Sequence, residues 1–308
     1  MRNIWAANGL LMLTAIAWGT TAPVFHELLK TWDPLSITTV RFILTMPLFY
    51  IWLRISEGVH RPPLSRRAWC ETLMLGFLLV AFAVVLNIGI HLSDPITAAV
   101  YSAGAPLVSG VLDWLLNGRR PARTVVLGIP FAVAGGILAS VDIADLGGTN
   151  FNTAGSLWLL GAVILWPLYS ALLQRWLTGL SQLRRTTVSF AAAVPFGIVA
   201  TAIALASGIE TLPNTMPDTR GYVLIGWSVV GTSIVGTLCW NIGVSRLGIS
   251  VASMFLNFIP VVAIIVSIGF GISPRPEQLA GALLVMIGVA IAQGWHRRLR
   301  RRTLPMGE

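Results

Sequence analysis

A small set of polar and aromatic side chains lies deep inside long apolar stretches of the sequence. Hydrogen-bonding groups in such surroundings are costly unless they find a partner. Hydroxyl, amide, indole and guanidinium groups at these places can recognise a ligand, but they do not form a bond-breaking constellation. The candidate ligand-binding residues are Trp18, Thr21, Arg41, Tyr101, Ser102, Trp166, Tyr169 and Asn257.

Arg41 is the one charged member of this set, and it follows Pro34 by seven residues in an apolar run. A charge inside a membrane span costs about 2.5–3.5 kcal/mol on insertion scales, so it must be paired or face water. Two interpretations carry equal weight. Arg41 holds a ligand carboxylate through a bidentate hydrogen bond, or it makes a structural bond to helix-end carbonyls or to Glu27.

The aromatic and amide residues also have two possible interpretations each. Trp18 and Trp166 either line a cavity or are core tryptophans whose indole N–H groups bond to backbone carbonyls. Asn87 and Asn241 either bond between helices or contact a ligand, and the first interpretation is favoured. Asp113 is either a proton carrier or an ion-pair partner of nearby arginines, again with the structural role favoured.

Motifs for catalysis are missing from the chain. We find no H-E-x-x-H, Gly-x-Ser-x-Gly or Walker A sequence, and the four histidines do not have metal-ligand spacing. The sequence therefore predicts no catalytic residues, no metal and no cofactor, and any active transport must use a proton or substrate gradient. Charged residues make up 11% of the chain, against about 25% in soluble domains, which excludes a soluble enzyme. The basic residues form no single face, so nucleic acid is not an expected partner.

The elements that position these residues are ten apolar runs, each about long enough to cross a bilayer as a helix. Uniform apolarity without alternation excludes a β-barrel. The fold class predicted is an all-α integral membrane protein. The runs are about 5–29, 34–53, 68–91, 95–117, 123–141, 154–177, 184–207, 220–245, 248–271 and 276–295.

Orientation follows from the positive charges in the connecting loops. With ten alternating spans, 17 of the 21 Lys and Arg residues fall on the side that holds both termini. Three fall on the other side, and Arg41 lies within a span. We expect both termini to be cytoplasmic and the chain to lie in a bacterial-type plasma membrane, in contact with membrane lipid. The oligomeric state has no signature in the sequence.

The chain repeats itself at a spacing of about 150 residues. An odd repeat of five spans enters the membrane from opposite sides in its two copies, and inverted repeats are common in secondary transporters. We predict a first repeat at 1–147, a second, inverted repeat at 148–296 and a basic cytoplasmic tail at 297–308. The matches are Asn87-Ile88-Gly89 with Asn241-Ile242-Gly243, Ala98 with Ala252, Pro106 with Pro260, Gly128 with Gly281, Gly135 with Gly288, Ala139 with Ala292 and Trp18 with Trp166.

The sequence resembles the drug/metabolite transporter superfamily in its ten-helix bacterial form, which is built from two EamA domains. The resemblance covers nearly the whole chain. It implies an inner-membrane carrier, often an exporter of amino acids and related metabolites. Where that family usually carries Gly-Glu, this chain has Gly118-Arg119 and Ile272-Ser273. The matching residues are Ala15-Ile16-Ala17-Trp18-Gly19, Arg41-Phe42, the stretch 98–106, the stretch 252–262, Gly128 and Gly281.

Prolines near the centres of the spans are candidate hinges. A proline inside a helix cannot bond to the carbonyl four residues earlier, so Pro106 and Pro260 are predicted to free the carbonyls of Ser102 and Leu256. The hinge candidates are Pro106, Pro167, Pro195 and Pro260. The leading hypothesis is an alternating-access exporter of amino acids or amino-acid-like metabolites. The alternatives are a lipid flippase, a membrane enzyme and an assembly factor without solute transport.

Overall fold

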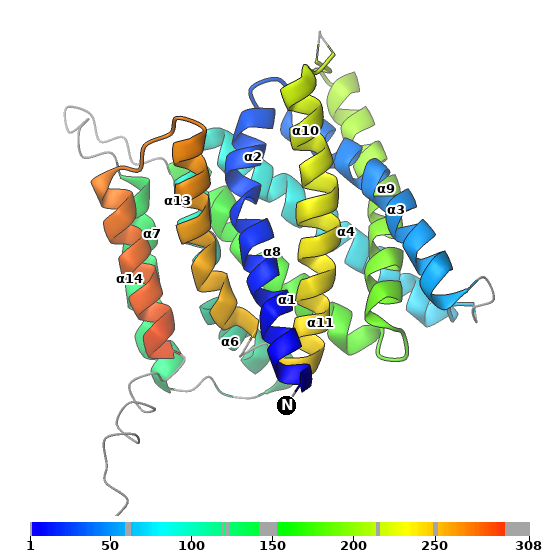
Figure 1. The fold of residues 1–308 in the computed structure, drawn as a ribbon, viewed down its shortest axis with the longest axis horizontal. Helices are drawn as coiled ribbons and strands as arrows, with labels where there is room; N and C mark the ends of the chain where they lie inside the picture. Colours follow the sequence, from blue (N-terminus) through cyan, green and yellow to red (C-terminus); the bar gives the residue numbers. More distant parts are fainter. Residues whose placement is uncertain are drawn as a thin grey trace, which may run out of the picture.

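The computed structural model describes residues 2–58, 63–118, 120, 123–141, 153–213, 216–248 and 252–292. Throughout these ranges the chain is helical and contains no strand (Figure 1). Most helices run in the same direction as their neighbours or opposite to it, so they form a bundle with two opposite ends. The N-terminus and the end of the last helix lie at the same end of this bundle (Figure 1).

The helices of the first half begin mostly at polar or proline residues. Asp94 accepts hydrogen bonds from the backbone N–H groups of Ile96 and Thr97, and Ser65 accepts one from that of Ala68. The helices are α1 (Arg2–Gly19), α2 (Thr21–Leu28), α3 (Pro34–Glu57), α4 (Arg66–Leu92), α5 (Pro95–Ala103), α6 (Ala105–Asn117) and α7 (Arg123–Ser140).

The second half differs from the first in two places: α8 is continuous where α1 and α2 are separate, and a π-helix interrupts the helix that corresponds to α4. Ser181 and Asp218 cap the helices that follow them. The elements are α8 (Thr153–Trp176), α9 (Gln182–Ala206), α10 (Thr219–Trp227), the π-helix η2 (Ser228–Gly236), α11 (Thr237–Leu247), the 3-10 helix η3 (Ser253–Phe258), α13 (Ile259–Gly269) and α14 (Pro276–Ala292).

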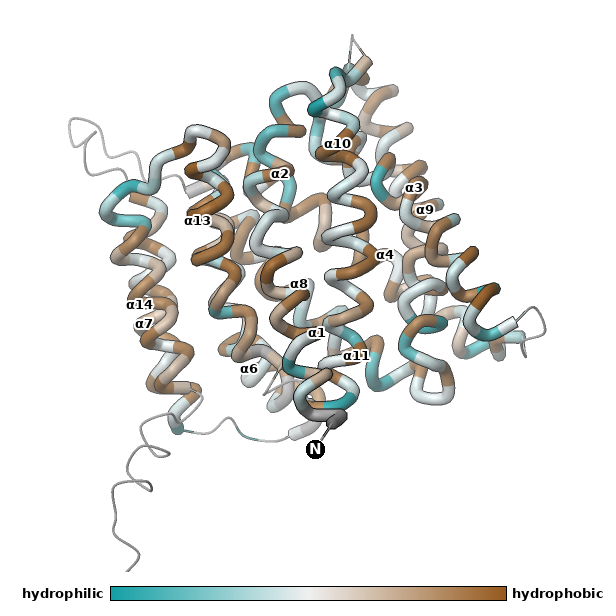
Figure 2. The backbone as a smooth tube through the Cα atoms, viewed as in Figure 1, coloured by the Kyte–Doolittle hydropathy of each residue, from teal (hydrophilic) through white to brown (hydrophobic). Residues whose placement is uncertain are grey.

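The lengths and composition of these helices fit a lipid environment. Among the described residues, eight helical segments are long and apolar enough to cross a membrane, and two shorter apolar helices, Met254–Gly269 and Pro276–Ala292, follow them. Many large apolar side chains point outward, including Leu127 and Val223. Hydrophilic residues gather mainly toward the two ends of the bundle (Figure 2). In water this surface would be unfavourable, whereas lipid tails solvate it.

The helices α7 and α14 pack so closely that their backbones touch. A Cβ atom added at Gly135 would lie 2.5 Å from the Gly281 carbonyl oxygen, and one added at Gly128 would lie 2.3 Å from that of Gly288. The two helices are antiparallel, because the order of contacts is reversed along α14. Glycine alone permits this approach, as it does in other membrane helix pairs. We call these four residues the glycine seam.

The helices α3 and α9 form a second antiparallel pair. Near one end the Thr39 and Thr201 hydroxyls are 2.8 Å apart, and farther along the rings of Phe42 and Phe190 meet edge to face with centroids 5.4 Å apart. Beyond the other end of the pair, the Ser181 hydroxyl hydrogen-bonds to the Glu57 carboxylate.

Two asparagines make equivalent bonds in the two halves. The Asn87 Nδ2 donates to the Thr38 hydroxyl at 2.8 Å, and the Asn241 Nδ2 donates to the Thr186 hydroxyl at 2.7 Å. All four side chains are buried. The interpretation of both asparagines as bonds between helices is therefore supported by their contacts.

Breaks in the spans coincide with two of the four candidate hinges. α5 gives way to α6 at Gly104, just before Pro106, and η3 gives way to α13 at Phe258, just before Pro260. By contrast, α8 and α9 continue through Pro167 and Pro195. The hinge role of all four prolines stays a prediction.

The prediction of free carbonyls before Pro106 and Pro260 was wrong in its simple form. The Gly104 N–H is bonded to the carbonyls of Ser102 and Tyr101, and the Ile259 N–H is bonded to that of Leu256. The physical reason is that the chain tightens before each proline into i→i+3 or shorter bonds, which supply the missing donor.

Candidate functional site

A cavity lies among the helices of both halves, near the middle of their length. It holds about 120 Å³ of space open to water-sized molecules. This is comparable to the roughly 150 Å³ apolar cavity that admits benzene. Its walls are mostly apolar with a few hydroxyls and one charge, as small-molecule sites commonly are. The lining residues are Trp18, Thr21, Ala22, Arg41, Phe42, Leu79, Phe82, Leu86, Ala99, Ser102, Ala105, Ala162, Val163, Trp166, Phe190, Thr232, Ser233, Thr237, Leu256 and Ile259.

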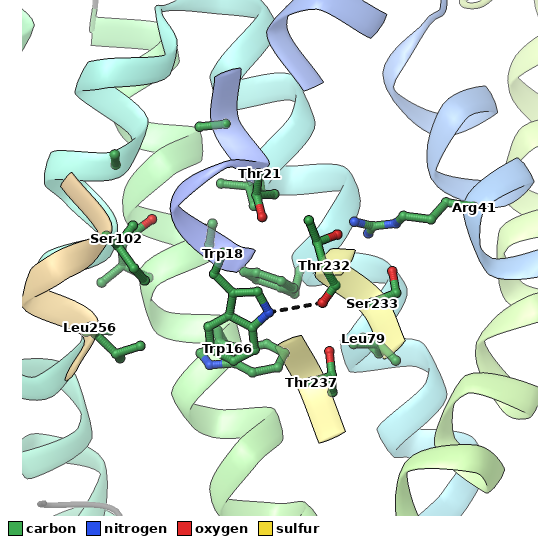
Figure 3. Close-up of a pocket in the computed structure, with 18 of the residues that line it drawn as sticks. Trp18, Thr21, Arg41, Leu79, Ser102, Trp166, Thr232, Ser233, Thr237 and Leu256 are labelled. Carbon is green, nitrogen blue, oxygen red and sulfur yellow. Dashed lines mark hydrogen bonds between the residues drawn. The ribbon is translucent and has the colours of Figure 1, made fainter. Parts of the chain in front are cut away.

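Aromatic rings form one wall of the cavity. The rings of Trp18 and Trp166 meet edge to face with centroids 4.9 Å apart, and Phe82 packs on Trp166 at 5.1 Å. The Trp18 indole N–H donates to the Thr232 carbonyl oxygen at 3.1 Å (Figure 3). The Trp166 Nε1 is buried and has no hydrogen-bond partner within the described chain.

The π-helix η2, which belongs to the second half, packs directly against Trp18. A Cβ atom added at Gly236 would lie 2.4 Å from the Trp18 Nε1. The wider turns of a π-helix often occur at functional sites, and η2 contributes the lining residues Thr232 and Ser233. Both hydroxyls donate to the Ser228 carbonyl oxygen, at 2.7 and 2.9 Å.

The lining is built from equivalent positions of the two halves. The repeat spacings of 148 and 154 residues pair many lining residues with one another. In the view of Figure 3, Ser102 and Leu256 are on one side of the cavity and Leu79 and Ser233 are on the opposite side. The pairs are Trp18 with Trp166, Phe42 with Phe190, Leu79 with Ser233, Ser102 with Leu256 and Ala105 with Ile259.

Arg41 reaches the cavity from α3 with its guanidinium pointing inward (Figure 3). The guanidinium carbon lies 4.8 Å from the centroid of Phe25 and 5.3 Å from that of Phe42. These cation–π contacts hold the planar group and leave its N–H edge available. Its Nε is buried and bonds to no described residue.

The structural tie between Arg41 and Glu27 was wrong. Glu27 instead forms ion pairs with Lys30 and with Arg220, the latter at 2.8 Å. Both partners come from the end of the bundle where α2 ends and α10 begins. No carboxylate of the described residues pairs with Arg41, so its charge is balanced by none of them.

In the second half, the two residues that correspond to Arg41 and Thr21 bond to each other. Residues 38–42 read Thr-Thr-Val-Arg-Phe and residues 186–190 read Thr-Thr-Val-Ser-Phe, so Ser189 takes the place of Arg41. Tyr169 similarly takes the place of Thr21. The Tyr169 and Ser189 hydroxyls are 2.9 Å apart and satisfy each other, whereas the Thr21 hydroxyl and the Arg41 Nε both lack partners in the described chain.

Five of the eight candidate ligand-binding residues line the cavity, namely Trp18, Thr21, Arg41, Ser102 and Trp166. The other three lie outside its lining. The Tyr101 hydroxyl bonds to that of Ser140 at 3.2 Å, Tyr169 bonds to Ser189, and the Asn257 Oδ1 is buried without a partner in the described chain. Ligand contact remains a prediction for all eight. The side chain of Asp113 lies outside the described side chains.

Sequence reasoning missed the contribution of η2 and α11. Thr232, Ser233 and Thr237 line the cavity from the second half. Their spacing within one apolar run was an available signal, because three hydroxyls within six residues are unusual in a span. The repeated Thr-Thr-Val-x-Phe motif was another, and it identifies Phe42 and Phe190 as equivalent lining residues.

Comparisons with known proteins agree with this architecture. The chain matches the EamA-like transporter family over residues 5–141 and again over 153–293, and it belongs to that family. It is 26% identical to the uncharacterized transporter YyaM of Bacillus subtilis, covering 92% of each chain. It is 25% identical to the uncharacterized inner membrane transporter YedA of Escherichia coli K12, covering 95% of this chain and 92% of YedA.

A solved crystal structure has the same fold, with a TM-score of 0.68 at 17% identity, and covers 95% of this chain and 98% of its own. The family, the relatives and the apolar helices together define a multi-pass protein of the bacterial inner membrane. They indicate a transporter rather than an enzyme, with a small-molecule substrate and a lipid environment.

Proposed function

We propose that this protein is an alternating-access secondary transporter of small metabolites of about amino-acid size. The observation that carries the proposal is the cavity lined by equivalent residues of the two halves. A site at the interface of two equivalent halves can open to either side when the halves exchange conformations. A static scaffold has no need for such a cavity.

The proposal includes ten membrane crossings arranged as two inverted five-helix repeats. Its support is the antiparallel packing of two equivalent helix pairs, α7 with α14 and α3 with α9. Equivalent helices that lie antiparallel are related by a two-fold axis perpendicular to them, which lies in the plane of the membrane. The excess of Lys and Arg at the end that holds the N-terminus supports cytoplasmic termini.

The moving parts in this proposal are the broken spans. Gly104 and Phe258 are separated by 154 residues, the same spacing that relates Pro106 to Pro260, so the two breaks occupy equivalent places. Both border the cavity, because Ala105 and Ile259 line it. Rocking of one half against the other about these breaks would change access to the cavity.

The direction proposed is export, and the substrates are amino acids or amino-acid-like metabolites. The cavity size and its aromatic wall support a substrate with a small apolar body. The export direction is carried over from the resemblance to the drug/metabolite transporter superfamily. Energy would come from a proton or substrate gradient.

Counterflow in proteoliposomes tests the proposal. Vesicles loaded with an unlabelled amino-acid mixture should accumulate labelled amino acids faster than protein-free vesicles. A Ser102→Trp variant, which fills the cavity, should lose this uptake, and Leu127→Trp, at a 61% exposed outward position, should keep it. No saturable uptake over a broad panel of amino acids and their carboxylate derivatives, in vesicles containing folded protein, would overturn the carrier.

The alternative function is lipid movement between leaflets. In the same vesicles, fluorescent lipids that become accessible to an impermeant quencher at a protein-dependent rate would favour the flippase. The carrier proposal expects a rate equal to that of protein-free vesicles.

A further inference from the structure

The cavity contains one charged side chain, and nothing among the described lining residues offsets it. Arg41 is the only Lys, Arg, Asp or Glu in the described lining. A buried cation without a counter-ion is unstable unless water or a ligand compensates it. The positive charge therefore favours anionic ligands, whatever their shape.

Three side-chain groups of the lining are themselves fully buried without a hydrogen-bond partner within the described residues: the Arg41 Nε, the Trp166 Nε1 and the Thr21 hydroxyl. The first two can only donate, and a hydroxyl can donate as well. The hydroxyl hydrogens of Ser102, Thr232 and Ser233 are already used on backbone carbonyls. The buried unpaired groups of the lining are thus mainly donors, and they favour a ligand that carries acceptors.

Two of these groups, Arg41 and Thr21, have no unpaired equivalent in the second half. Arg41 and Thr21 of the first half are replaced by Ser189 and Tyr169, which bond to each other. Their bond leaves no equivalent vacancy in the second half. A ligand therefore has its one charged anchoring point at Arg41, and much of the remaining lining is apolar, including Phe82 and Leu256.

Resting on the proposed function, we infer that the cavity selects small organic monoanions over zwitterions and cations. The anionic group, a carboxylate or sulfonate, accepts hydrogen bonds from Arg41 and Thr21, and an apolar body lies against the aromatic wall. A zwitterionic amino acid carries an ammonium group as well, and no carboxylate in the described lining receives it. Among amino-acid-like metabolites, those whose amine is absent or acylated are therefore preferred.

A series with one apolar body and three charge states tests this selectivity. The ligands are 3-phenylpropanoate and 2-phenylethanesulfonate as anions, phenylalanine as the zwitterion and 2-phenylethylamine as the cation. A second series with a branched aliphatic body comprises 4-methylpentanoate, leucine and 3-methylbutylamine. Binding is measured at neutral pH by calorimetry on the full chain in nanodiscs. The anion of at least one series should bind at least about tenfold tighter than its zwitterion and cation.

Variants assign this preference to Arg41. Arg41→Gln should abolish the preference, and Arg41→Lys should keep it in weaker form because the charge remains but the planar fork is lost. The matched control, Arg67→Gln, removes one positive charge from an exposed ion pair with Glu71 and should leave the preference unchanged. Without ligand, Arg41→Gln should unfold at the same or a higher temperature than the native chain, because an uncompensated buried charge is removed.

Several results would overturn the inference. These are equal or tighter binding of the zwitterions, an unchanged preference in Arg41→Gln, no saturable binding of any anion in either series, and loss of folding in both Arg41 variants, which would make Arg41 structural. Counterflow separates this inference from the carrier itself. Uptake of phenylalanine by the native chain that equals or exceeds uptake of 3-phenylpropanoate would rule out the anion preference and keep the transporter. Anion binding without any transport would support the anion site and rule out the transporter.

Discussion

Trp18 and Trp166 occupy equivalent positions of the two halves, and their rings meet edge to face with centroids 4.9 Å apart. In the proposed inverted-repeat arrangement, two equivalent residues that touch lie beside the axis that relates the halves. Their environments nevertheless differ, because the Trp18 N–H is bonded to the Thr232 carbonyl and the Trp166 N–H is unbonded within the described chain.

This difference predicts unequal effects of the same substitution. Trp18→Phe removes a hydrogen bond and should lower the free energy of unfolding by about 0.5–1.5 kcal/mol more than Trp166→Phe. Each change removes the same volume from the same aromatic wall, so each is the control for the other. Thermal or denaturant unfolding in detergent measures both, and equal losses would contradict the assignment of the bond.

The glycine seam predicts a strong effect of a single methyl group. In Gly135→Ala the new Cβ would meet the Gly281 carbonyl oxygen at 2.5 Å, so α7 and α14 must separate. Overpacking of this kind costs about 1–3 kcal/mol. Gly9→Ala is the control, because a Cβ at Gly9 has no neighbour within 4 Å. Gly135→Ala should unfold at a lower temperature than Gly9→Ala. A Gly135→Ala protein as stable as the control would show that α7 and α14 can separate at the seam without a loss of stability.

The two asparagine bonds predict two similar double-mutant cycles. Asn87→Ala combined with Thr38→Val, and Asn241→Ala combined with Thr186→Val, each remove one buried bond. Such bonds in membranes couple by about 0.6 kcal/mol and at most about 1.7 kcal/mol. We expect both cycles to fall in this range. A coupling near zero in either cycle would mean that the bond does not stabilise that half.

Glu210 caps the helix that carries Arg41. Its carboxylate accepts hydrogen bonds from the Leu35 and Ser36 backbone N–H groups at 2.7 and 3.0 Å and from the Ser36 hydroxyl at 2.9 Å. In return the Asp33 carboxylate accepts from the Thr211 N–H at 2.6 Å. The start of α3 and the segment after α9 are thereby bonded to each other in both directions.

The cap predicts a loss of about 1–3 kcal/mol in the free energy of unfolding for Glu210→Ala, since three bonds to a mostly buried carboxylate disappear. Glu71→Ala breaks only the pair with the exposed Arg67 and should cost no more than about 1 kcal/mol. Both are measured by unfolding in detergent. If Glu210→Ala costs no more than Glu71→Ala, the cap does not hold α3.

Much of the fold followed from patterns that membranes impose on a sequence. The apolar runs predict where the helices lie, because lipid requires every backbone group to be bonded within a helix. The repeated glycines served in the sequence only as matches between the halves, and the structure shows that they allow close packing between α7 and α14. The local tightening before Pro106 and Pro260 was not predictable, since several bond patterns satisfy the same carbonyls.

The site was harder to predict, because depth within a span does not determine the direction of a side chain. Tyr101 and Tyr169 lie deep in their spans but turn to Ser140 and Ser189. Arg41 and Thr21 have the same kind of surroundings in the sequence, yet they face the cavity. Rotation of each helix about its own axis decides these outcomes, and it depends on packing between segments far apart in the chain.

If the halves rock as proposed, the glycine seam limits how they can move relative to each other. Where backbone touches backbone, sliding one helix along the other would push a carbonyl oxygen into the neighbouring chain at each of the seam's contacts. A small tilt about the line of contact meets no such obstacle. The α7–α14 pair is therefore suited to be a pivot, with the largest displacements falling on the helices farthest from it.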